Sequence, residues 1–199
     1  MNFTEYNVND KNLEEILLAL KSLDAVEAVA LGGSRSTGEA DENSDYDIYV
    51  YCSEIPTGKT RENLLGKYCS VAEFGNHYWE SEDNTVMNNG TPVDIIYREI
   101  DRFGGYIDTV IKGGKAFNGY TTAFWHNIRN SKVLFDKTGT FTKFRDMAQI
   151  DYPENLRRAI IKNNRSLLSG KLPSYDRQIK KMQERGDIAV SYTHLTLPT

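Results

Sequence analysis

LGGSRSTGEADENSDYDIYVY, residues 31–51, is the stretch that decides the fold, together with PVDIIYR at residues 92–98. A glycine-serine turn follows an apolar run, and then Asp45 and Asp47 lead into a second apolar run. The later segment places Asp94 inside a further alternating run. Because side chains alternate along a strand, this pattern predicts Asp45 and Asp47 on one face, with Asp94 on a neighbouring strand about 4.8 Å away.

These three aspartates predict a metal-dependent site. Three carboxylates this close repel one another unless a cation compensates their charge. Ligand sets made only of oxygen select hard cations such as Mg²⁺ or Mn²⁺. Two such ions about 3.5–4 Å apart can hold the attacking and leaving oxygens of an in-line displacement at phosphorus. The arrangement therefore suits phosphoryl or nucleotidyl transfer with two divalent ions.

The glycines before the aspartates fit a phosphate-binding turn. Gly32 and Gly33 leave room for backbone N–H groups to approach a triphosphate. Ser34 adds a hydroxyl donor, and Arg35 can neutralise a phosphate oxygen. Gly38 lets the loop turn back toward the aspartates. Each feature alone is ordinary, and it is their order and spacing that indicate the site.

Apolar periodicity predicts the elements around this segment. Helical periods cover residues 11–22, which Asn9 or Asp10 can cap, and residues 61–68. Strand patterns cover residues 25–31, 46–52, 71–79, 84–88 and 92–98, with a hairpin turn at Asn88-Asn89-Gly90. We therefore expect an α+β fold, with a small mixed β-sheet flanked by helices and followed by a partial helical region.

The pattern changes near residue 101. Helical periods appear at 101–112, 156–168 and 174–185, with a short apolar piece at 132–135. We expect residues 1–100 to form the catalytic core and residues 101–190 a mainly helical C-terminal region that is truncated in this chain. The closing residues 191–199, SYTHLTLPT, have no amphipathic period and resemble a translated sequencing-adapter read. We expect them to be a non-native tail.

The bulk composition narrows the class of protein. In 199 residues, 39% are hydrophobic and 26% charged, which is typical of a soluble globular protein. A formal net charge of −4 argues against a nucleic-acid binder that relies on overall basicity. Two cysteines, Cys52 and Cys69, and no long apolar run indicate a reduced, cytoplasmic protein that does not span a membrane.

One other motif competes for the chemistry. Residues 136–140, DKTGT, resemble the phosphorylation motif of P-type ATPases, in which the aspartate becomes an aspartyl phosphate. Such pumps need membrane helices, which the apolar pattern here does not provide. The simpler interpretation is a short strand at 133–135 followed by a polar turn in which Gly139 supplies the bend.

The motifs together resemble the signature of the DNA polymerase beta-type nucleotidyltransferase superfamily, in its small bacterial branch of aminoglycoside, lincosamide and minimal nucleotidyltransferases. The matching residues are Gly32-Gly33-Ser34, Arg35, Gly38, Ser44-Asp45-Tyr46-Asp47 and Val93-Asp94-Ile95. The resemblance implies a mixed sheet with the site at one edge, an NTP donor that is usually ATP, and Mg²⁺. It also implies transfer of a nucleoside monophosphate to a hydroxyl of a small molecule, with release of pyrophosphate.

Carried over by position, the resemblance also implies roles for individual residues. Asp45 and Asp47 would bind both metals, and Asp94 would bind the catalytic metal and help deprotonate the acceptor hydroxyl. The implied nucleotide-binding residues are Gly32, Gly33, Ser34, Arg35 and Ser44.

The identity of the acceptor or partner stays open at this point. An acidic protein favours a small acceptor, cationic ones included, over a long polynucleotide, because anionic RNA would be repelled. The alternative is an antitoxin-like nucleotidyltransferase module that acts on or binds a protein partner. His126, beside Trp125, fits a structural or acceptor-facing role better than a catalytic one.

Overall fold

The computed structural model describes residues 8–117, 121–170, 172 and 174–187. The expected non-native tail, residues 191–199, lies outside them. The chain forms two compact units. The first contains the residues up to Gly105 together with His126–Gln149, and the second contains Tyr106–Trp125 and the residues from Ile150 onward.

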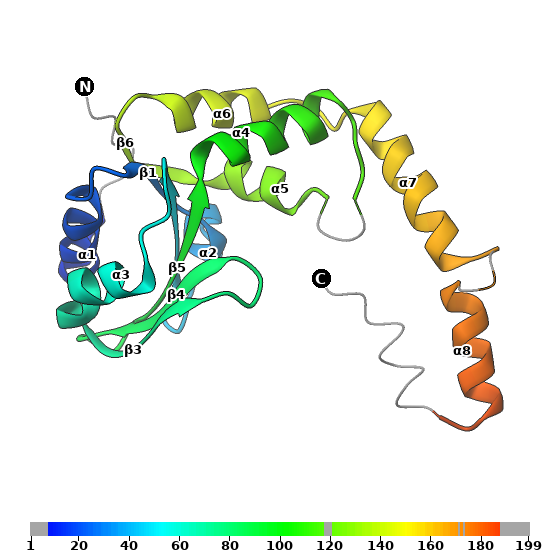
Figure 1. Ribbon diagram of the computed structural model, residues 1–199, viewed down its shortest axis with the longest axis horizontal. Coiled ribbons are helices and arrows are strands. Elements are labelled where there is room, and N and C mark those ends of the chain that lie inside the picture. The colour runs from blue at the N-terminus through cyan, green and yellow to red at the C-terminus, as the bar shows by residue number, and fades with distance from the viewer. Residues whose placement is uncertain (1–7, 118–120, 171, 173, 188–199) are drawn as a thin grey trace. The chain divides into compact units, whose positions relative to one another are not determined.

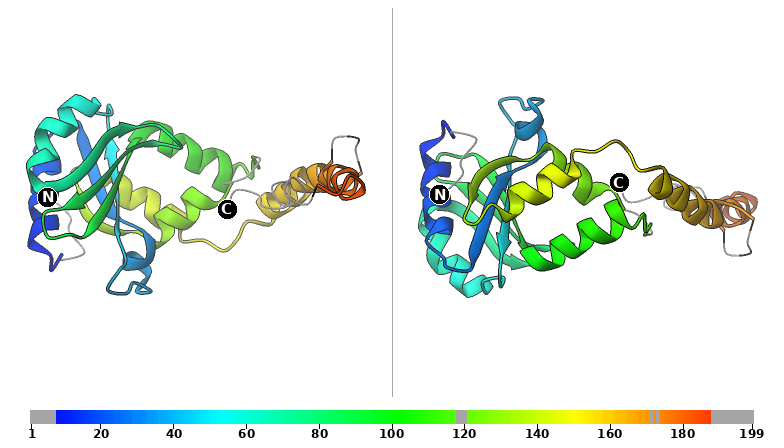
Figure 2. Two further views of the ribbon diagram at one scale, coloured as in Figure 1. Left: turned by 90° about the horizontal axis from the view of Figure 1, so that it is seen from below. Right: turned by 90° about the horizontal axis from the view of Figure 1, so that it is seen from above.

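A six-stranded mixed sheet forms the centre of the first unit (Figures 1 and 2). Its strand order is β3-β4-β5-β2-β1-β6. β2 and β5 run parallel, and every other neighbouring pair is antiparallel. The strands are β1 (Val26–Leu31), β2 (Tyr46–Cys52), β3 (Cys69–Asn76), β4 (Ser81–Met87), β5 (Pro92–Glu99) and β6 (Lys132–Asp136). This sheet with its flanking helices confirms the expected α+β fold.

Helices α1 (Lys11–Lys21) and α3 (Gly58–Leu65) cover one face of the sheet (Figure 1). The Asp10 side chain accepts the backbone N–H groups of Asn12 and Leu13, which confirms the expected cap of α1. Burial of an aliphatic side chain contributes about 1.5–3 kcal/mol, so this layer supplies much of the stability. Its fully buried members include Leu13, Ile16, Leu20, Val29, Val50, Leu65 and Ile95.

The opposite face is covered by α4 (Ile100–Ile107) and α6 (Thr140–Ala148). The Tyr51 ring packs against Phe103 and Phe141, with ring centroids 5.0 and 4.5 Å away. The second half of α5 (Ala123–Asn130) reaches the same face, where the Asn127 amide donates to the Tyr49 hydroxyl at 3.1 Å. This face of the sheet carries the side chains of Asp47 and Asp94.

The observed elements agree with the sequence prediction where a turn motif or a long apolar period marked them. The expected hairpin at Asn88-Asn89-Gly90 is confirmed, because Gly90 has a φ of +87° and the Met87 N–H donates to the Thr91 carbonyl at 2.9 Å. Three helices were not predicted: α2 (Gly33–Thr37), α5 and α6. They are only five to nine residues long, and so few residues leave little room for a helical period to show.

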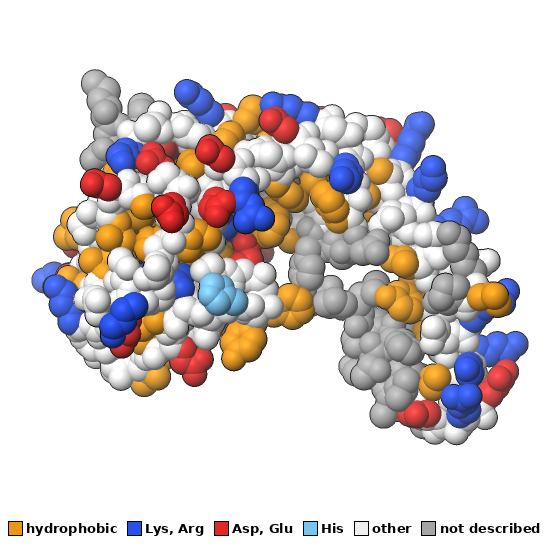
Figure 3. All heavy atoms as spheres, in the orientation of Figure 1, with side chains coloured by type: hydrophobic (Ala, Val, Ile, Leu, Met, Phe, Trp, Pro, Cys, Tyr) orange, Lys and Arg blue, Asp and Glu red, His pale blue; other side chains and the backbone are white. Residues whose placement is uncertain are grey.

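The second unit is mainly helical among its described residues. The last part of α4 continues into a π-helical stretch, η2 (Asp108–Lys112), followed later by α7 (Glu154–Leu168) and α8 (Tyr175–Glu184). These helices confirm the helical periods at 101–112, 156–168 and 174–185. Lys and Arg side chains gather along α7 and α8 (Figure 3). No helix among the described residues is long and apolar enough to cross a membrane.

Candidate active site

The turn after β1 is pressed against β2, and this contact explains its glycines. The Gly32 N–H donates to the Asp47 carbonyl at 2.8 Å. A Cβ on Gly32 would lie 2.3 Å from Cε2 of Tyr49. A Cβ on Gly33 would lie 1.8 Å from Oδ2 of Asp47, and Gly33 has a φ of +58°. Only glycine fits these two positions without displacing the neighbouring side chain.

The sheet brings two of the three aspartates together. Asp47 and Asp94 are direct register partners on the parallel strands β2 and β5. Side chains at partnered positions share one face of a sheet, so their carboxylates are neighbours. Asp45 lies one residue before β2 begins, in the segment that leads into the strand. All three aspartates are half-buried.

The electrostatics of this group favour a bound cation. Burial, together with the negative charges of Asp45 and Asp94, raises the pKa of Asp47 to about 6. Oxygen-only donors fit Mg²⁺ or Mn²⁺, and a cation would relieve this repulsion. Within the described ranges, no three His, Cys, Asp or Glu side chains form a ready-made metal cage. The carboxylates therefore fit an ion that takes its remaining ligands from elsewhere, such as substrate phosphates.

The raised pKa of Asp47 leads to a pH prediction for the metal-free protein. As pH rises from about 4 to about 6, the unfolded chain loses this proton while the folded site still holds it. The stabilising contribution of the neutral carboxyl is therefore lost as pH rises through about 6. Asp47→Asn should stabilise the metal-free protein by about 1–2 kcal/mol near neutral pH, a value discounted for solvent screening.

Urea unfolding of wild type and Asp47→Asn without divalent ions tests this expectation. The difference in free energy of unfolding should be present at about pH 8 and nearly vanish at about pH 4. An equal difference at both pH values would show that charge repulsion at Asp47 is not its cause.

Arg35 and Ser44 shape the loop that carries Asp45. The Arg35 guanidinium donates to the carbonyls of Ser44 and Asp45, the latter at 2.8 Å, and lies over the Tyr46 ring at 4.1 Å. The Ser44 hydroxyl donates to the Asp41 carboxylate at 3.0 Å, closing a turn. Arg35 lines a different cavity from the one that Gly33 and Ser34 line. In the structure, Arg35 and Ser44 therefore hold the backbone of the loop that carries Asp45.

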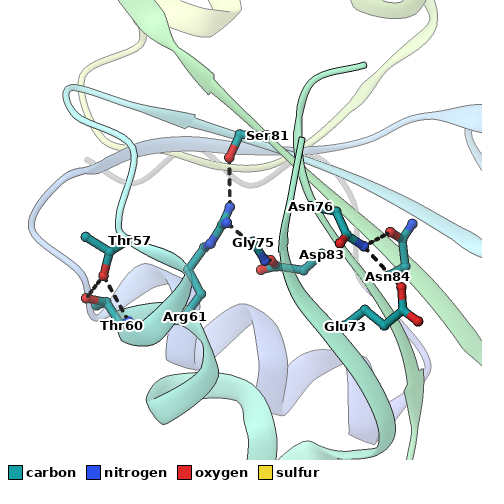
Figure 4. Close-up of polar contacts among 9 residues, drawn as sticks. All are labelled: Thr57, Thr60, Arg61, Glu73, Gly75, Asn76, Ser81, Asp83 and Asn84. Carbon is teal, nitrogen blue, oxygen red and sulfur yellow. Dashed lines mark hydrogen bonds and ion pairs between the residues drawn. The ribbon is translucent and has the colours of Figure 1, made fainter. Parts of the chain in front are cut away.

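Sequence reasoning missed Asn84, which holds one of the aspartates. Its amide Nδ2 donates to Oδ1 of Asp94 at 3.0 Å. Its Oδ1 accepts from Asn76 at 2.7 Å, the bond drawn in Figure 4. The second bond fixes which end of the Asn84 amide faces Asp94. The hairpin turn in the sequence could have revealed this contact. Met87 and Thr91 close the turn, and counting the same number of residues along each strand away from them brings Asn84 opposite Asp94.

Asp136, the rival candidate, is built into the fold. It is fully buried, and its Oδ1 accepts the Gly139 N–H at 2.9 Å. Its Oδ2 accepts both the N–H and the hydroxyl of Thr142, at 2.8 and 2.7 Å. Gly139 has a φ of +75°, which confirms the simpler interpretation of a strand followed by a glycine turn. A carboxylate engaged in this way is a structural cap rather than an accessible nucleophile.

A mixed sheet in which a tight glycine turn packs against strand carboxylates is the arrangement expected of an enzyme that transfers phosphorus-containing groups. Comparison with protein-family models makes this specific. The model of the nucleotidyltransferase domain matches residues 13–117, more than half of the chain, and the protein belongs to that family. This confirms the superfamily and the general reaction, transfer of a nucleoside monophosphate. A search of curated proteins finds no match to the chain.

Proposed function

We propose that this protein transfers a nucleoside monophosphate from an NTP, preferably ATP, to a hydroxyl of a small molecule, with Mg²⁺ as cofactor. The observation that carries the proposal is the pairing of Asp47 with Asp94 across β2 and β5, with the Gly33 backbone packed on the Asp47 carboxylate. This places the turn proposed to hold phosphates directly beside the carboxylates proposed to hold metals.

The side chains divide the work in the proposed reaction. Asp45 and Asp47 would hold two Mg²⁺ ions, with Mn²⁺ as a substitute, and Asp94 would share the catalytic one. When bound, the ions would neutralise charge on the triphosphate and on the attacking oxygen. The Asn84 amide donates to Oδ1 of Asp94 and so fixes this carboxylate, which would accept the proton of the acceptor hydroxyl. The hydroxyl oxygen then bonds to the α-phosphorus, and pyrophosphate leaves.

The same face of the sheet supports a small, cationic acceptor. Glu82 lies on β4, and burial raises its pKa, with the charges of Asp94 and Glu80 adding to the shift. Carboxylates that raise one another's pKa create a negative local field, which attracts cations and repels polynucleotides. Amino sugars and other hydroxylated amines therefore fit this surface better than RNA.

Thermal unfolding with each of the four NTPs, with and without Mg²⁺, tests the proposal. A nucleotide at about 100 times its dissociation constant should stabilise wild type by about 2.7 kcal/mol. Asp47→Asn should lose the Mg²⁺-dependent part of this shift, because it removes a metal ligand. Asp136→Asn, compared with its own ligand-free melt, should keep the shift.

The opposite result, a nucleotide shift kept in Asp47→Asn and lost in Asp136→Asn, would contradict the proposed site. The acceptor class is tested by pyrophosphate release. It should be stimulated by hydroxylated amines and not by RNA oligonucleotides.

A further inference from the structure

A polar cavity of about 270 Å³ lies within the first unit, between α2 and the second half of α5. One wall comes from Gly33 and the residues that follow it, and the other from His126, Asn127 and Asn130. Because Gly33 touches the Asp47 carboxylate, the cavity opens next to the proposed metal ligands. Sequence reasoning had no means of joining these two segments.

The lining indicates the kind of ligand. Among the described residues, the walls are made by Gly33 and by hydroxyl, amide, carboxylate and imidazole side chains, with no Val, Leu, Ile, Phe, Tyr or Trp. Pockets for bases and other ring ligands are predominantly apolar and aromatic. A small cavity lined by hydrogen-bonding groups instead suits a compact, strongly polar group such as a phosphate.

Several of these lining groups are already committed to the protein. The Ser36 hydroxyl donates to the Gly33 carbonyl at 2.7 Å, and the Thr37 hydroxyl donates to the Ser34 carbonyl at 3.1 Å. Asn127 donates to the Tyr49 hydroxyl, and burial raises the pKa of Tyr49 to about 12, so that hydroxyl stays protonated. These contacts fix the walls and use the protons of the Ser36 and Thr37 hydroxyls, whereas the Asn127 amide keeps a second hydrogen.

Ser34 and His126, one on each wall, can also donate to a ligand. The Ser34 hydroxyl has no hydrogen-bond partner in the described part of the chain. His126 is exposed, and its ring contacts the Asn130 amide, 3.2 Å from Nδ1 and 3.3 Å from Nε2. Asn130 also donates to the His126 carbonyl at 2.9 Å. A ring nitrogen that accepts from Asn130 leaves the other nitrogen as the N–H donor in the neutral imidazole.

We infer that His126, oriented by Asn130, donates a hydrogen bond to the terminal phosphates of the NTP, opposite Ser34. The inference rests on the proposed function, and it assigns α5 to the donor side of the reaction. It replaces the expected structural or acceptor-facing role of His126. Glu39, whose carboxylate also lines the cavity, would oppose a phosphate unless a divalent ion accompanies it.

Calorimetric titration with Mg²⁺-tripolyphosphate, Mg²⁺-ATP and AMP tests the inference. His126→Ala should weaken binding of tripolyphosphate and ATP by about tenfold or more, the typical loss for a hydrogen bond to a charged group. AMP binding should not change, because AMP lacks the terminal phosphates. His77→Ala is the matched control, since His77 is exposed in the same unit and does not line the cavity.

Two further variants sharpen the result. Glu39→Gln should act in the opposite direction and tighten tripolyphosphate binding without Mg²⁺. His126→Gln, which keeps an N–H donor, should recover part of the lost affinity and serves if His126→Ala does not fold. Unchanged binding in both His126 variants, an equal loss for AMP and ATP, or no tripolyphosphate binding by wild type would each overturn the inference.

Different results would contradict the role of His126 and the proposed function. An Asp47-dependent ATP shift that persists fully in the His126 variants would overturn the role of His126 and leave nucleotidyl transfer standing. Tripolyphosphate binding that depends on His126, without pyrophosphate release from any NTP, would support the cavity and sink the proposed reaction.

Discussion

Replacing Arg61 with methionine is expected to destabilise the protein by about 3–5 kcal/mol, because it leaves a buried charge without its partner. Arg61 and Asp83 are 1% and 0% exposed, and Nη2 of Arg61 lies 3.4 Å from Oδ1 of Asp83. Arg61 also donates to the Ser81 hydroxyl at 3.0 Å (Figure 4). Its guanidinium lies 4.4 Å from the centre of the Tyr97 ring. These contacts tie α3 to β4 and β5.

The surroundings of Asp83 explain the size of this effect. Burial raises the pKa of Asp83 even though the Gly75 N–H and the Arg61 charge act in the opposite direction. Without Arg61, the carboxylate must take up a proton or the structure must open. Equilibrium urea unfolding measures the loss, which should shrink at acid pH, where Asp83 is neutral.

The double variant Arg61→Met with Asp83→Asn is the control. Removal of both charges should cost much less than removal of Arg61 alone, and the amide oxygen can still accept the Gly75 N–H. If the double and single variants were equally unstable, packing of the arginine stem rather than charge would explain the loss.

Gly33→Ala is expected to reduce nucleotidyl transfer by about 100-fold or more, the order of loss that follows a 1 Å misplacement at a reacting site. Two costs combine at this position. An L residue at a φ of +58° is strained, and the new methyl would lie 1.8 Å from the Asp47 carboxylate. Either the glycine turn or the Asp47 carboxylate must move, and either movement separates the turn from the proposed metal ligand.

Gly38→Ala isolates the contact from the backbone strain. Gly38 has a φ of +85°, but a Cβ there would meet no atom within 4 Å. We expect the backbone strain in Gly38→Ala to lower the free energy of unfolding by about 1 kcal/mol, and so to lower the melting temperature slightly. The variant should keep Mg²⁺-dependent nucleotide binding. Comparable losses of nucleotide binding in both alanine variants would show that the Asp47 contact has no special role.

The sequence predicted those parts of the fold whose cause is local. The cap at Asp10, the turn at Gly90 and the core stripe of α1 each follow from residues close together in the chain. The mixed sheet followed from the order of the apolar runs. The sequence also predicted Asp94 on a strand next to the one that carries Asp47, although the register that pairs the two residues became visible only in the structure.

The missing parts depend on contacts between distant segments. The residues next to Asn84 and His126 in the chain form no motif that would indicate a function. Asn84 acts through its bond to Asp94, and His126 through the cavity that it lines together with Gly33. For Arg35, a phosphate ligand in the sequence prediction, the structure adds a contact that the motif did not indicate: its guanidinium donates to the backbone of the Asp45 loop.

The parallel pairing of β2 with β5 has a consequence for how the molecule assembles. The β3–β4 hairpin lies between these strands in the chain, so Asp47 and Asp94 meet only after a long loop has closed. Closing such a loop costs entropy before its contacts form, and topologies of this kind fold slowly. The hairpins can form first, because their partners are close in sequence. During refolding, competence to bind nucleotide should therefore be gained late, and it would report the docking of β5 onto β2 more directly than total β-structure does.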